Sequence, residues 1–171
     1  MQLTRQTQTP TISDLREISD GTRGTLETLK LMRVLVRNSK KSLPIRLFAL
    51  SLLDSLKQKD YAGEAQRIHA FVRDNIRYVR DVRGVETLHT PEKVLELRAG
   101  DCDDKATLSA ALLESIGHPT RFVALGFRDD AFSHVYVETK MGNNWVGFET
   151  TEPVKFGWTP PRATSRMVVH N

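Results

Sequence analysis

The chain has 171 residues, of which 39% are apolar and 27% charged, and its formal net charge at pH 7 is +4. This length suits one domain with a small addition, and the composition is ordinary for a protein with a hydrophobic core. No apolar run approaches the roughly 20 residues that span a bilayer, and the N-terminus lacks the apolar stretch of a signal peptide. A single cysteine excludes an internal disulfide. We therefore expect a cytoplasmic protein with no membrane partner.

The positive charge is concentrated near the N-terminus. Residues 1–41 carry eight Lys or Arg and four Asp or Glu, whereas residues 42–171 carry 17 of each. A basic end of this kind could bind a protein or nucleic-acid partner. It is not interleaved with the aromatic side chains of a single-strand binding platform, and a solvated helix face explains the same charges more simply.

Apolar residues at helical spacing characterise the first half of the chain. Residues 1–20 are polar and predict a flexible arm, and residues 25–38 predict a first helix. Ser42 is a possible N-cap, and Pro44 suits the first turn of a second helix that continues through IRLFALSLLDSLKQ. A third helix is predicted over about residues 62–78.

Two further helices are predicted before the sequence pattern changes. Thr90 is a predicted N-cap, and Pro91 opens the short helix PEKVLELR. After a break at Gly100, a helix begins near Cys102 and ends at Gly117. Because the residues of this last helix are mostly small or apolar, we expect it to be buried on most sides.

Alternation replaces helical spacing in the last third of the chain. Strands are predicted over residues 120–127, 133–140 and 144–151, and MGNN is typical of a hairpin turn. The segment GWTPPR predicts an extended tail, with His170 near a frayed end. Helices followed by a meander of strands indicate an α+β fold, in which the cysteine-bearing helix packs on an antiparallel sheet.

The hairpin turn decides whether a histidine meets a carboxylate. A two-residue Gly-Asn turn, or a four-residue loop in the same register, places His134 opposite Thr151 and makes Glu149 its diagonal neighbour. A three-residue loop would move Glu149 to the other face. The pair is therefore conditional on the turn.

Cys102, His134 and Glu149 are the candidate catalytic residues. A lone cysteine is more often an inert core residue, and a strand histidine is more often a hydrogen-bonded core residue. Together, however, a cysteine at a helix N-terminus followed by a histidine and an acid on adjacent strands supplies a nucleophile, a base and an orienting acid.

The sequence resembles the transglutaminase-like superfamily of cysteine enzymes. The resemblance rests on LRAGDCDDKATLSAALLESIGHPTRFVALGF, SHVYVE and WVGFETT, and on the upstream segments VRDNIRYVRD and TPEKVLELR; it covers about residues 66–151. It implies a papain-like fold with Cys102 as nucleophile and His134 as general base. Glu149 stands where the family usually has Asp. The basic helical lead-in is similar to that of bacteriophage and prophage members, which would mean a bacterial or phage-encoded protein.

On this basis we predict a basic N-terminal arm with helices over residues 1–61 and a catalytic domain over residues 62–171. The expected activity is acyl transfer on amide bonds of a protein or peptide through a thioester, as a peptidase, amidase or transamidase. The alternative is a non-catalytic binding or assembly protein, such as a phage-associated one, that keeps the fold and binds a partner through its basic helices.

The acids around the cysteine are interpreted as helix-start chemistry. Asp101 is the predicted N-cap, whereas Asp103 and Asp104 are expected to turn away from the sulfur, toward Lys, Arg or solvent. The helix N-terminus and His134 would then favour the Cys102 thiolate.

DCDD lacks the spacing of an EF-hand loop or a zinc site, so no metal and no cofactor is predicted. Tyr78 could supply a phenol donor or be a half-buried aromatic residue. The other histidines, including His69, His89 and His118, are interpreted as structural.

Overall fold

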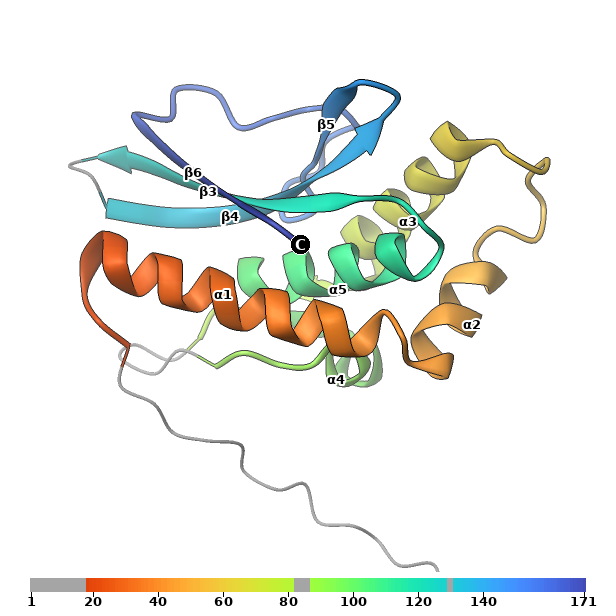
Figure 1. The fold of residues 1–171 in the computed structure, drawn as a ribbon, viewed down its shortest axis with the longest axis horizontal. Helices are drawn as coiled ribbons and strands as arrows, with labels where there is room; N and C mark the ends of the chain where they lie inside the picture. Colours follow the sequence, from red (N-terminus) through yellow and green to blue (C-terminus); the bar gives the residue numbers. More distant parts are fainter. Residues whose placement is uncertain (1–17, 82–86, 129–130) are drawn as a thin grey trace, which may run out of the picture.

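The computed structural model describes residues 18–81, 87–128 and 131–171. Over these residues the chain is an α+β fold, as predicted: helices cover one face of an antiparallel sheet (Figure 1). The predicted N-terminal arm lies almost entirely outside the described residues. The helices are α1 (Gly21–Ser39), α2 (Leu43–Ser51), α3 (Tyr61–Asn75), α4 (Pro91–Leu97) and α5 (Cys102–Ser115). The strands are β1 (Arg77–Tyr78), β2 (Ala99–Gly100), β3 (Thr120–Arg128), β4 (Ala131–Met141), β5 (Asn144–Phe148) and β6 (Ser165–His170).

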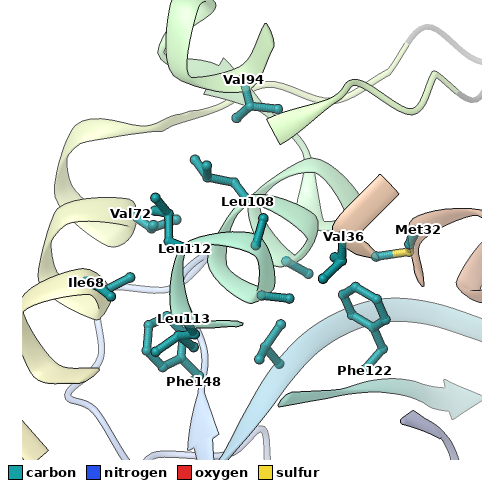
Figure 2. Packing of buried hydrophobic residues seen from close by; sticks show 14 of the residues in the cluster. Met32, Val36, Ile68, Val72, Val94, Leu108, Leu112, Leu113, Phe122 and Phe148 are labelled. Carbon is teal, nitrogen blue, oxygen red and sulfur yellow. The ribbon is translucent and has the colours of Figure 1, made fainter. Parts of the chain in front are cut away.

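Helix α5 is the centre of the core, and its predicted burial on most sides is confirmed. Helices α1 to α4 all contact it, and strands β3 and β4 cover its remaining side. Figure 2 shows Leu108, Leu112 and Leu113 of α5 among side chains from α1, α3 and the sheet. The sequence of α5 has no single apolar stripe because nearly every side of the helix meets another element.

The N-terminal helices contribute to this same core. Met32 and Val36 of α1 and Ile45 of α2 are fully buried in one hydrophobic cluster with residues of α5. The division of the chain after residue 61 stays a prediction. Of the helices in the described residues, none combines the length and apolar character needed to cross a membrane.

The third helix ends earlier than predicted. Helix α3 stops at Asn75, and Arg77 and Tyr78 form a short parallel strand with Ala99 and Gly100. This strand is held by hydrogen bonds from Arg77 N to Arg98 O (2.9 Å) and from Val79 N to Gly100 O (3.0 Å). The partner is distant in sequence, so helical spacing alone could not reveal where the helix ends. Helix α2 likewise ends before the predicted apolar segment does, and turns follow it.

The hairpin between β4 and β5 has a two-residue turn, one of the two alternatives that place His134 and Glu149 on the same face. Met141 pairs with Asn144, and the same register continues to the pair Val137 and Phe148. Gly142 has a φ of 59°, a left-handed conformation that glycine adopts without a steric penalty.

The C-terminal segment forms a strand that the sequence interpretation missed. Instead of a frayed end, Ser165–His170 is β6, which pairs antiparallel with β3 and gives the sheet order β5-β4-β3-β6. Met167 and Val169 pack against the main core, while Val168 packs on the opposite face. The apolar run over residues 167–169 is too short to predict a strand so soon after a proline-containing segment.

Candidate active site

Cys102 is the first residue of α5. The side chain of Asp101 accepts hydrogen bonds from the backbone amides of Asp103 (3.0 Å) and Asp104 (3.1 Å), so its predicted role as N-cap is confirmed. Gly100 permits the close approach of β2 to this first turn, because an added Cβ would lie 2.5 Å from the Cβ of Asp104. The thiol therefore sits at a tightly built helix start.

His134 and Glu149 meet as the register predicts. His134 Nε2 lies 2.6 Å from Glu149 Oε2, and the other carboxylate oxygen accepts bonds from the backbone amide (2.6 Å) and hydroxyl (2.5 Å) of Thr151. Glu149 has no exposed surface. Although burial raises the pKa of Glu149, the bonds from His134 and Thr151 outweigh it and lower that pKa below its ordinary value. The carboxylate is thus held in its charged form behind the imidazole.

One cavity joins the thiol to the imidazole. Its volume is about 620 Å³, and both Cys102 and His134 line it. A backbone hydrogen bond from Val135, the residue after His134, also reaches the Cys102 thiol. The first turns of α1 form the facing wall, which includes Gly21, Gly24 and Thr25. Sequence reasoning assigned no part of the site to these N-terminal residues.

The expectation that the acids after Cys102 turn away from the sulfur is wrong for Asp103. Cys102 Sγ donates a hydrogen bond to Asp103 Oδ1 at 3.4 Å. Burial, followed by the negative charges of Asp103 and Asp101, raises the pKa of the Cys102 thiol well above its ordinary value. The expected preference for a thiolate is therefore also wrong for the free protein, because desolvation and nearby carboxylates oppose the helix N-terminus.

Among the residues that the structure describes, Asp104 bonds to a histidine, where a Lys, an Arg or solvent was expected. Its side chain is buried and accepts hydrogen bonds from the His89 backbone amide (2.9 Å) and from His89 Nδ1 (2.8 Å). These bonds fasten the segment before α4 to the first turn of α5. The two residues are 15 positions apart, and only the folded chain makes them neighbours.

Asp101, Cys102 and Asp103 place possible metal-ligand atoms within 4.8 Å of one another. Asp101 already acts as the N-cap, and the thiol already donates to Asp103. Burial raises the pKa of Asp101 to about 6. Helix capping and the thiol bond account for this grouping.

Tyr78 lies on β1, beside the β2 residues that lead into Cys102. It is 43% exposed. Burial raises the pKa of its phenol, and the negative charge of a Cys102 thiolate adds to that effect. Both interpretations of Tyr78, as a donor and as a half-buried aromatic residue, stay open.

Two buried polar residues lie behind the site, and the sequence analysis assigned neither to it: His69 was interpreted as structural, and Lys105 was not discussed. His69 Nε2 donates to the backbone oxygen of Glu149 at 2.6 Å. Lys105 Nζ donates to the backbone oxygen of Ile76 at 2.6 Å, and burial lowers the pKa of Lys105 to about 8. The available signal was a polar residue on a helix face otherwise made of core residues.

Comparison with solved structures shows the same fold. A proposed protease from Parabacteroides distasonis is 17% identical with a TM-score of 0.59, over 72% of this chain and 26% of that one. A proposed cysteine protease from Cytophaga hutchinsonii is 19% identical with a TM-score of 0.52, over 75% of this chain and 46% of that one. EGTA-treated LapG from Legionella pneumophila is 16% identical with a TM-score of 0.53, over 77% of each chain. The chain thus spans about a quarter of the first structure and under half of the second.

No curated protein matches the chain. Residues 51–150, more than half of the sequence, match the family model of the transglutaminase-like superfamily. The chain therefore belongs to the transglutaminase-like superfamily.

Proposed function

We propose that the protein transfers acyl groups from amide bonds of a protein or peptide through a Cys102 thioester, with His134 as base and acid and Glu149 as its orienting carboxylate. The observation that carries this proposal is the cavity that Cys102 and His134 both line, with His134 bonded to a buried Glu149 at 2.6 Å. A nucleophile, a base and a group that orients the base are the parts that thiol acyl transfer requires.

The raised pKa of the thiol determines how the first step begins. Because Cys102 does not ionise readily by itself, its proton passes to the imidazole of His134 as the sulfur attacks the carbonyl carbon. His134 already uses Nε2 for Glu149, so Nδ1 is the ring nitrogen that receives the proton. The buried carboxylate stabilises the imidazolium that results. The backbone amide of Cys102 is a donor for the oxygen of the tetrahedral intermediate.

In the second step, His134 returns the proton to the leaving nitrogen as the C–N bond breaks, and a thioester on Cys102 remains. Water then gives hydrolysis, and an amine gives transamidation. Glu149 can fill the role usually held by Asp because it lies just beyond the end of β5 and its side chain reaches back to His134.

The proposal predicts acylation of Cys102 by p-nitrophenyl acetate. We expect a burst of p-nitrophenol and an acetyl adduct on the intact protein. The adduct should vanish in Cys102→Ala, and acylation should slow at least about a hundredfold in His134→Ala, because proton transfer is lost. Adding methylamine and following the adduct distinguishes transfer to an amine from hydrolysis.

Cleavage of amides is tested with a mixture of tryptic peptides and mass spectrometry. New termini or amine adducts that depend on Cys102 support the proposed reaction. If p-nitrophenol release does not change in Cys102→Ala, the nucleophile is misassigned. If neither probe gives a product that depends on Cys102, the non-catalytic binding protein becomes the better interpretation, and its partner should be sought at the basic N-terminal helices.

A further inference from the structure

Glu149 is held at two separate points. Its carboxylate bonds to His134 and Thr151, while its backbone oxygen accepts a hydrogen bond from His69 Nε2 at 2.6 Å. His69 lies on α3, is 1% exposed, and packs edge-on against Phe148 with ring centroids 5.1 Å apart. Its ring is therefore fixed within the core.

The hydrogen bond from His69 reaches the backbone oxygen of Glu149 just beyond the point where the pairing between β4 and β5 ends. The ladder between β4 and β5 ends at the pair Val137 and Phe148, one residue before Glu149. A buried carbonyl oxygen without a partner is unfavourable. His69 supplies that partner and anchors the backbone of Glu149 to α3.

We propose that His69 is a positioning residue: it fixes the backbone of Glu149 so that the carboxylate meets His134. The catalytic consequence rests on the proposed function. Misplacing a catalytic group by about 1 Å can cost two orders of magnitude in rate, so the loss of this anchor weakens the assistance that His134 gives to Cys102.

The charge state of His69 is consistent with this role. Burial lowers the pKa of His69, and Arg73 adds to that effect, against the opposing influence of its bond to Glu149 and of Asp74. A carbonyl oxygen can only accept, so Nε2 of His69 carries the proton in the neutral ring. Lys105 of α5 also interacts electrostatically with Glu149. The anchor works with a neutral His69.

The test compares His69→Leu, which removes the donor, with His69→Gln, which retains an amide N–H at similar reach. The rate at which iodoacetamide alkylates Cys102 is measured against pH, with His134→Ala as reference for the unassisted thiol. We expect the part of the alkylation rate that depends on His134 to fall at least about tenfold in His69→Leu. His69→Gln should stay within about threefold of the unsubstituted protein.

His118→Gln is a matched control, because His118 is also buried and bonds to Glu64 at 2.7 Å. The rate at which Cys102 is alkylated should not change in this variant. If His69→Leu does not fold, the comparison passes to His69→Asn, whose shorter amide cannot reach the same oxygen. A His134-dependent rate that is unchanged in a folded variant without the donor overturns the proposal.

A second readout separates this inference from the proposed function. The NMR signal of the His134 Nε2 proton reports its bond to Glu149 in the absence of any reaction. We expect this signal to persist in His69→Gln and to be lost in His69→Asn. If the signal persists in His69→Gln and is lost in His69→Asn, but His134→Ala has no effect on alkylation, then His69 does position Glu149 and the proposed catalytic role of His134 is wrong. If the signal persists in both variants, His69 is not a positioning residue.

Discussion

At the scale of single residues, the environment of Cys102 is set by two opposing influences. The helix start and the Val135 amide favour a thiolate, whereas burial and the carboxylate of Asp103 favour the thiol. The second influence is larger, so the protein in its free state holds a protonated nucleophile. A base within reach is then essential for reaction near neutral pH.

Replacing Asp103 with Asn should lower the pKa of Cys102, because the negative charge of Asp103 disfavours the thiolate and the substitution removes that charge. In a His134→Ala background, where only ionisation of the thiol is followed, the pH profile of alkylation should move down by about one pH unit. Asp54→Asn, an exposed carboxylate outside the cavity lining, should leave it unmoved. An unchanged profile in Asp103→Asn would show that the charge of Asp103 does not contribute, and that burial and Asp101 raise the pKa of Cys102.

At the scale of elements, α1 has two functions. One face packs against α5, and its first turns form a wall of the cavity that contains Cys102. In Figure 1 the helix runs alongside α5 beneath the sheet. A helix outside the recognised motifs therefore shapes the site and contributes to the core.

The contribution of α1 to the core is tested by Met32→Ala, which should lower the free energy of unfolding by about 2–4 kcal/mol because it empties a fully buried position. Val34→Ala on the same helix is the matched control: Val34 is 51% exposed, and its truncation should change stability by less than about 0.5 kcal/mol. Urea unfolding measures both. If Met32→Ala affects only a minor early transition, the predicted N-terminal segment unfolds separately from the remainder.

At the scale of the whole molecule, two carboxylates of the site make stability depend on pH in opposite directions. The lowered pKa of Glu149 stabilises the fold above its ordinary pKa, and this contribution is lost as the pH falls through the folded value. Asp101, whose pKa is raised to about 6 by burial, behaves in the opposite way. Between its ordinary value of 3.8 and about 6, the folded state binds more protons, so stability falls as the pH rises.

Asp101→Asn isolates the second effect, because Asn is an equally good N-cap but does not ionise. Relative to this variant, the unsubstituted protein should lose stability as the pH rises from about 4 to about 6, with no further loss above that range. Urea unfolding at a series of pH values gives the difference. A constant difference between the two proteins across the series would contradict the raised pKa.

Local chemistry determined what could be predicted from the sequence alone. The Gly-Asn turn sets the register that brings His134 to Glu149, Asp101 caps α5, and small and apolar residues all round α5 indicate its burial. Each of these depends on neighbours a few residues apart, or on one hairpin, so spacing and turn chemistry are sufficient.

Only the tertiary structure decided the contacts between distant segments. These include the pairing of β6 with β3, the cavity wall from α1, the Asp104–His89 pair and the bond from His69 to Glu149. The raised pKa of Cys102 belongs with them, because desolvation depends on everything packed around the thiol. Residue spacing describes faces and turns, whereas burial and long-range partners arise only when the elements pack together.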